Sequence, residues 1–109
     1  MYIDSHAHLE MSDYDHDRDK MIKRALDQGI DKIVTIGIDK KECEQAIKLA
    51  ATYPFIYVAL GLHPHNAKKS DNNLFDFIKE NARHKNVVAL GEMGLDFFKN
   101  WSPRLDQIR

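Results

Sequence analysis

The sequence has 109 residues, of which 43% are hydrophobic and 30% charged, and this balance predicts one globular domain of ordinary size. Its 16 Lys and Arg residues against 17 Asp and Glu residues give a net charge of −1, which excludes a global basic footprint for nucleic acid but leaves a local basic patch open. The one cysteine, Cys43, excludes an internal disulfide and fits a reducing compartment. Because no apolar run is long enough for a membrane span or a signal peptide, we expect no membrane partner and a cytoplasmic location.

Short apolar segments alternate along the chain with amphipathic segments, which predicts strands alternating with helices. Gly29 is placed to end the first helix, and residues 39–42 resemble a capping box that starts the second. Pro54 marks the end of that second helix, since proline disfavours a helical residue before it. Strands are predicted over residues 1–4, 32–36, 55–61 and 87–91, and helices over residues 13–28, 39–53 and 73–84.

The three later strands are continuous apolar runs, such as Val-Val-Ala-Leu at residues 87–90, and show no alternation with polar residues. Such runs are typical of strands that are covered on both faces of a parallel sheet. Together with the alternating order of strands and helices, they predict an α/β fold built from βαβ units. In both open α/β sheets and TIM barrels, chemistry lies at the carboxyl ends of the parallel strands.

The end of the chain reads as the start of another helix, with Ser102 as its N-cap and Pro103 at the first helical position. No cap or stop signal follows before Arg109. Four strands cannot close a barrel that needs eight. We therefore expect residues 1–109 to be an incomplete single domain.

A pair of histidines, His6 and His8, directly follows the first predicted strand. Residues two apart on an extended segment point the same way, so both imidazoles can face one point. Imidazole is a common ligand of Zn, Mn, Fe and Ni ions. The spacing therefore favours a metal site over two unrelated polar residues at a strand end.

Two more polar clusters follow later strands, at residues 61–65 and 91–96. Glu92 comes directly after an apolar strand, and its carboxylate could bridge two cations, cap a helix or pair with a lysine. His63 and His65 flank a proline and are candidates for substrate binding. Asp4 and Asp96 are more often turn residues, or acceptors for the ring N–H of a metal-binding histidine, than ligands.

Positively charged residues fall in or just after the predicted strand-to-helix loops. They would put positive charge on the same edge of the sheet as the polar clusters, which would suit an anionic substrate. These residues are Lys40, Lys41, Lys68, Lys69, Lys99 and Arg104.

The three motifs Asp-Ser-His-Ala-His-Leu at residues 4–9, Gly-Leu-His-Pro at 61–64 and Gly-Glu-Met-Gly-Leu-Asp-Phe at 91–97 together resemble the TatD-type metal-dependent deoxyribonucleases of the amidohydrolase superfamily. The resemblance spans essentially the whole chain, with the motifs in the right order. It implies the N-terminal part, about four βα units, of a TIM barrel of about 250 residues. It also implies two divalent metal ions (Mg²⁺, Mn²⁺ or Zn²⁺), DNA as the substrate and hydrolysis of its phosphodiester bonds.

Carried over residue by residue, the resemblance makes His6 and His8 ligands of one metal ion. Glu92 matches the carboxylate that bridges to the second ion, and His63 matches the histidine near the substrate phosphate. Glu92 and His63 are thus the expected catalytic residues of this chain. Two further histidines and an aspartate, the expected base, come from later strands of the family's barrel, beyond residue 109.

Two other functions stay open from the sequence. The same scaffold hydrolyses amides and esters with similar metals, so a metal-dependent deacylase or amidohydrolase is the first alternative. The second is a truncated, non-catalytic fragment that associates with itself through uncovered strand edges.

Overall fold

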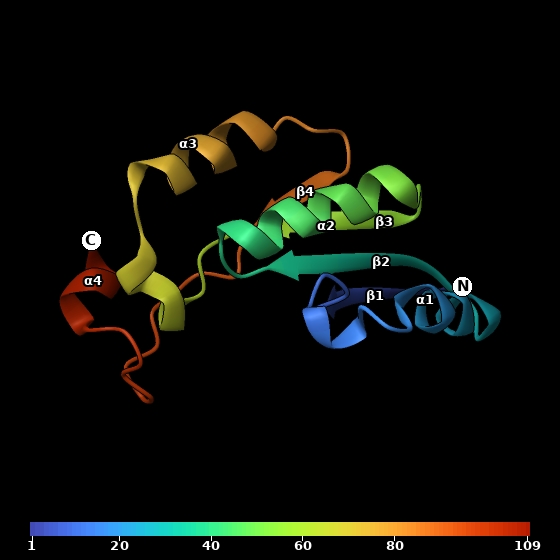
Figure 1. Cartoon of the computed structure of the whole chain (residues 1–109), viewed down its shortest axis with the longest axis horizontal. Helices are drawn as coiled ribbons and strands as arrows, with labels where there is room; N and C mark the ends of the chain where they lie inside the picture. The colour runs from blue at the N-terminus through green and yellow to red at the C-terminus, as the bar shows by residue number, and fades with distance from the viewer.

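The computed structural model describes residues 1–109 as a four-stranded sheet with helices packed against it (Figure 1). The strands are β1 (Tyr2–Ala7), β2 (Ile30–Gly37), β3 (Ile56–Leu60) and β4 (Val87–Leu90). The α-helices are α1 (Arg18–Asp27), α2 (Lys40–Thr52), α3 (Asn72–Asn81) and α4 (Arg104–Ile108). Two 3₁₀ helices, η1 (Ser12–Tyr14) and η2 (Pro64–Lys69), lie in the loops after β1 and β3.

All neighbouring strands are parallel, in the order β1-β2-β3-β4, as the alternation of strands and helices predicts. Because the helix-containing segments after β1, β2 and β3 return the chain to the other end, all four carboxyl ends meet at one edge of the sheet (Figure 1). The residues after β1, β3 and β4 therefore come together although they are far apart in sequence.

The hydrophobic core lies between the sheet and the helices packed on β2 and β3. Side chains alternate along a strand, so Ile56, Val58 and Leu60 all point to the same face, and each is fully buried. Cys43 and Ala46 of α2 pack on this face, also with no exposed surface. Both residues lie in the helix that the sequence predicts over residues 39–53.

Helix boundaries agree with the sequence where a side chain or a glycine decides them. Asp39 Oδ1 accepts a hydrogen bond from the Glu42 backbone N–H at 3.0 Å, which is one half of the predicted capping box. Gly29 follows the C-cap of α1 with φ +88°, a left-handed conformation that glycine adopts without strain. The prediction of Ser102 as an N-cap is wrong: α4 begins at Arg104, and the Ser102 hydroxyl donates to the His65 backbone carbonyl at 2.7 Å.

Two other predicted boundaries differ from the structure. Strand β1 continues to Ala7, which pairs with Thr35 of β2, so His6 lies within the strand and not behind it. Helix α1 starts at Arg18, five residues later than predicted, because the Arg18 side chain binds the carbonyl oxygens of Leu9 and Met11 and holds the preceding segment as a turn. The first difference arises from pairing with a distant strand and the second from side-chain contacts to residues seven and nine positions earlier, and periodicity reports neither.

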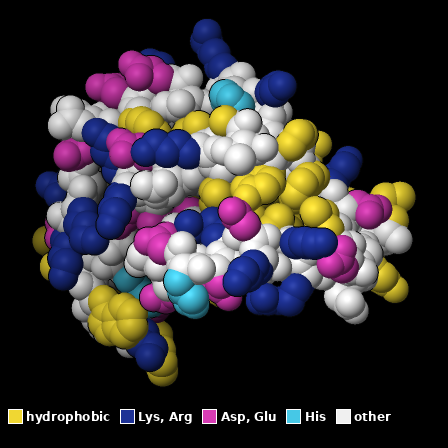
Figure 2. All heavy atoms as spheres, turned by 45° about the vertical axis from the view of Figure 1, so that its right-hand side comes forward, with side chains coloured by type: hydrophobic (Ala, Val, Ile, Leu, Met, Phe, Trp, Pro, Cys, Tyr) yellow, Lys and Arg dark blue, Asp and Glu magenta, His cyan; other side chains and the backbone are white.

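Both edge strands of the sheet are exposed, and β4 is more exposed than its continuous apolar run predicts. Val88 and Leu90 of β4 keep more than half of their surface exposed, as do Tyr2 and Ile3 of β1. Coverage on both faces is therefore wrong for β4 in this structure, although β3 is largely buried. On the face shown in Figure 2, hydrophobic patches lie among interspersed positive and negative side chains. None of the helices is long and apolar enough to cross a membrane.

Candidate metal centre

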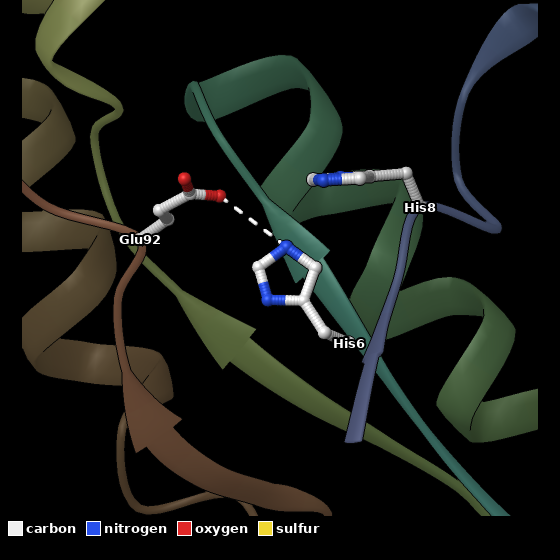
Figure 3. A group of neighbouring side chains, drawn as sticks. All are labelled: His6, His8 and Glu92. Atoms are coloured by element: carbon white, nitrogen blue, oxygen red, sulfur yellow. Dashed lines mark ion pairs between the residues drawn. The ribbon is translucent and has the colours of Figure 1, made fainter. Parts of the chain in front are cut away.

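His6 and His8 present their rings on the same side of the β1 end, as their spacing predicts. The two ring centroids are 5.2 Å apart and the rings are inclined by 77°. His6 is exposed and His8 is half-buried. In Figure 3 the His8 ring reaches into the same space as the His6 ring. The pair can therefore offer two nitrogen ligands to one ion.

Glu92 brings a carboxylate to this pair from the segment after β4. Its Oε2 lies 3.5 Å from His6 Nε2, and the two side chains point toward one another (Figure 3). Ligand atoms of His6, His8 and Glu92 all lie within 4.8 Å of one another. Two imidazole nitrogens and a carboxylate oxygen are a donor set that suits Zn²⁺ or Mn²⁺. The residues thus fit a divalent metal ion by both chemistry and spacing.

A buried carboxylate that the sequence analysis missed lies behind His8. Glu10 keeps only 4% of its surface exposed, and its oxygens accept hydrogen bonds from His8 Nδ1 at 3.2 Å and from the Thr35 hydroxyl. His8 Nδ1 also lies 2.9 Å from the Ile36 carbonyl oxygen. Because both neighbours of Nδ1 are acceptors, Nδ1 carries the proton, and Nε2 of the neutral ring is left as the metal-binding nitrogen.

His63 has the opposite arrangement. Its Nδ1 accepts a hydrogen bond from the His65 backbone N–H at 3.1 Å, in the turn that Pro64 starts. The proton of the neutral ring is therefore on Nε2, which lies 3.3 Å from Glu92 Oε1. His63 acts here as a donor to a carboxylate oxygen, and the two oxygens of Glu92 face two different histidines.

The remaining predicted residues lie at the margin of the centre. His65 Nε2 donates to Asp96 Oδ2 at 2.7 Å, and this hydrogen bond, helped by one from the Phe98 backbone N–H, holds the pKa of Asp96 below its usual range. Asp96 thus contacts a histidine outside the three-residue cluster. Asp4 accepts a hydrogen bond from the His6 backbone N–H at 3.1 Å, so it contacts the backbone and not a histidine ring.

The cluster lines a cavity of about 600 Å³ that is open to solvent. Asn66, Lys68 and Lys69 of η2 line it as well, together with Trp101. Two of the lysines predicted on this edge are therefore beside the cluster. Lys69 Nζ also pairs with Asp39 Oδ2 at 3.6 Å.

The sequence offered one usable signal for the missed residues. Glu10 continues the every-second-residue pattern of His6 and His8, and a carboxylate there is placed to reach a histidine ring. Trp101 and Asn66 lie in irregular loops, where spacing gives no indication of which side chains reach the cavity.

Comparison with known proteins decides the family. The family model of the TatD related DNases matches residues 3–109 of this sequence. The chain belongs to the TatD family. The resemblance of its three motifs is thereby confirmed.

Curated relatives are longer than this TatD chain. The uncharacterized metal-dependent hydrolase YabD of Bacillus subtilis (strain 168) is 39% identical over 104 residues, which are 95% of the chain and 41% of the relative. The 3'-5' ssDNA/RNA exonuclease TatD of Citrobacter koseri is 37% identical over 107 residues, 98% of the chain and 41% of the relative. The chain thus spans about 41% of the length of these TatD relatives.

Solved structures agree with the fold. The TatD homologue YJJV from Escherichia coli K12 superposes with a TM-score of 0.84 at 29% identity, over 98% of this chain and 42% of that chain. A TatD family hydrolase from Entamoeba histolytica gives 0.83 at 24% identity, with the same coverage of both chains. The four parallel strands and their helices match the N-terminal part of the TatD TIM barrel, as predicted.

Proposed function

We propose that residues 1–109 form one incomplete TIM-barrel domain and supply the metal-binding half of a TatD-type hydrolase that cleaves phosphodiester bonds in DNA. The observation that carries this proposal is the convergence of His6, His8 and Glu92, whose ligand atoms lie within 4.8 Å of one another. Membership of the TatD family and the names of the relatives, a metal-dependent hydrolase and single-strand nucleases, support the same reaction class. A cytoplasmic location stays a prediction.

The geometry supports three residues of this chain as metal ligands. His6 and His8 would hold one divalent ion together with Glu92, whose Oε2 lies 3.5 Å from His6 Nε2. The resemblance of the Gly-Glu-Met-Gly-Leu-Asp-Phe motif to the TatD nucleases implies that Glu92 would also bridge to a second ion. Mg²⁺, Mn²⁺ and Zn²⁺ are the candidate ions. Ions held in this way would activate a water molecule and offset the negative charge that develops on the phosphate.

Residues of the chain itself would orient the substrate phosphate. His63 presents an N–H toward the cluster, because its other nitrogen is occupied by the His65 backbone N–H. A phosphate oxygen beside Glu92 could accept a hydrogen bond from this N–H. His63 would then act as a hydrogen-bond donor to the substrate and not as a metal ligand. Lys68, which lines the same cavity, adds positive charge for the rest of the phosphate backbone.

The first test removes the bridging charge without changing the shape of the side chain. Glu92→Gln in the full-length protein should abolish nuclease activity on single-stranded DNA at saturating Mg²⁺, while circular dichroism and the Tm stay unchanged. Glu80→Gln, an exposed substitution on α3, is the matched control and should retain activity. Full activity of Glu92→Gln would overturn the bridging role. Hydrolysis of model esters but not of DNA by the wild-type protein would favour the deacylase alternative instead.

The second test measures the metal directly. Mn²⁺ and Zn²⁺ are titrated by calorimetry into the wild type, the His6→Ala/His8→Ala double variant and His16→Ala, an exposed histidine on the surface. Binding that is lost in the double variant and kept in His16→Ala supports the two-histidine site. Equal binding by all three proteins would contradict it.

A further inference from the structure

A tryptophan lies at the mouth of the cavity that holds the candidate metal centre. Trp101 is 57% exposed and lines the same cavity as His6, His8 and Glu92. Its ring packs against the His65 ring, with 4.3 Å between centroids and an angle of 55° between the planes. The tilted contact covers only part of the indole, and the rest of the exposed side chain lies beside the centre.

The backbone around Trp101 is tied to the rest of the fold. The next residue, Ser102, is fully buried, donates to the His65 carbonyl oxygen and accepts from the Lys68 backbone N–H at 3.2 Å. Gln107 of α4 donates to the backbone carbonyl oxygens of Asp96 and Ser102 at 2.8 and 2.9 Å. Both ends of the loop are therefore anchored, and the exposed ring is held at a defined place.

Three lysines lie over this ring or along the cavity that it lines. Lys99 Nζ lies over the Trp101 ring, 5.3 Å from its centroid, and Lys68 and Lys69 line the cavity on the η2 side. We define Trp101, His65, Lys68, Lys69 and Lys99 as the Trp101 rim.

We propose that the Trp101 rim binds an unpaired base of a single-stranded nucleic acid, with the adjacent phosphates held by its lysines. Every base offers a flat face that stacks on an aromatic ring, whatever the sequence, and positively charged side chains follow the backbone. A base inside a duplex is already stacked on its neighbours and cannot use the ring. The rim thus favours single strands and positions the strand so that a phosphate enters the cavity. This inference rests on the proposed nuclease function.

Binding without hydrolysis provides the test. A fluorescently labelled single-stranded oligodeoxythymidylate is titrated in EDTA into the wild type, Trp101→Ala, Trp101→Phe and Phe98→Ala. Phe98 is the control, because it is an aromatic residue of the same loop that is 91% exposed and does not line the cavity. We expect the affinity to fall about tenfold or more in Trp101→Ala, to recover largely in Trp101→Phe and to stay unchanged in Phe98→Ala.

Two further readouts separate stacking from a structural effect. The difference in intrinsic fluorescence between the wild type and Trp101→Phe isolates the Trp101 signal, and this signal should be quenched by the single strand but not by a blunt duplex. Lys68→Gln should lower the slope of log affinity against log salt concentration by about 0.7. Mn²⁺ affinity should be the same in wild type and Trp101→Ala.

The outcomes distinguish this inference from the proposed function. Unchanged oligonucleotide affinity and KM in Trp101→Ala, with hydrolysis that still requires Glu92, would overturn the Trp101 rim and leave the nuclease in place. Equal quenching by single strand and duplex would also overturn it. Trp101-dependent binding by a protein that does not hydrolyse DNA would support the rim and contradict the nuclease.

Discussion

A single methyl group at Gly61 should disturb the candidate metal centre without altering any of its side chains. Gly61 follows β3 and lies against the peptide that joins Gly91 to Glu92. A Cβ atom at this position would come 2.4 Å from the Gly91 carbonyl carbon and 2.7 Å from the Glu92 nitrogen. Gly61→Ala therefore pushes on the backbone that carries the proposed bridging carboxylate.

The displacement can be worked out from these distances. Ordinary contact for a Cβ atom begins at 3.4 Å, so the Gly91–Glu92 peptide has to retreat by about 1 Å. The hydrogen bond from the Gly91 N–H to the Leu60 carbonyl oxygen, now 2.8 Å long, would lengthen with it. A misplacement of about 1 Å at a reacting centre can reduce the rate about 100-fold. Overpacking of this kind costs about 1–3 kcal/mol of folding stability.

The assay compares Gly61→Ala with Gly37→Ala in the full-length protein. The added Cβ of Gly37→Ala would meet Cys43 Cα at 2.7 Å, so its overlap falls on α2 and not on Glu92. We expect both variants to lower the Tm, and only Gly61→Ala to weaken Mn²⁺ binding and to reduce DNA hydrolysis about 100-fold. A folded Gly61→Ala protein with wild-type metal affinity and rate would refute this reasoning.

Two further predictions concern buried groups beside the sheet. Asn86→Ala removes side-chain hydrogen bonds to the carbonyl oxygens of Ala50 and Ile56, which are 3.4 and 2.9 Å long. The free energy of unfolding, measured by urea titration, should fall by about 2 kcal/mol. The control Asn73→Ala, at an exposed position, should change it little. Burial raises the pKa of the Cys43 thiol from 9.0 to about 11. Near pH 8 the thiolate of the folded chain is therefore about 100-fold scarcer than that of the unfolded chain. Because the thiolate is the form that reacts, iodoacetamide should alkylate the folded chain at least about 100-fold more slowly. Because the fold accommodates the neutral thiol, the contribution of Cys43 to folding stability should be constant at neutral pH and decline as the pH rises above 9. Equal alkylation rates of the native and unfolded chains would contradict both the slower reaction and this pH dependence.

Features that depend on local pattern could be predicted from the sequence. The order of strands and helices, the Asp39 cap and the Gly29 stop follow from residue types at fixed spacings, and the structure has all three. The convergence of His6 and Glu92 could also be expected, because parallel strands bring their carboxyl ends to one edge. These inferences required no knowledge of contacts between distant residues.

Features that depend on distant contacts could not be predicted in this way. Ser102 has the residue type and position of an N-cap, yet its hydroxyl is used by the His65 carbonyl oxygen, which is 37 residues away in sequence. The continuation of β1 to Ala7 depends on pairing with Thr35 of β2. In each case a tertiary hydrogen bond competes with the local preference and prevails.

The roles of the histidines are of the same kind, because each role is decided by the nitrogen that faces away from the centre. His8 Nδ1 faces the Ile36 carbonyl oxygen and Glu10, both acceptors, so the neutral ring shows an unprotonated nitrogen to the cluster. His63 Nδ1 faces a backbone N–H, so the neutral ring shows a proton to Glu92. The first arrangement suits a metal ligand and the second suits a donor to an anion. The backbone N–H from which His63 Nδ1 accepts belongs to His65, in the turn that Pro64 starts. The Gly-Leu-His-Pro motif therefore determines the role of His63 through its turn as well as through the histidine itself.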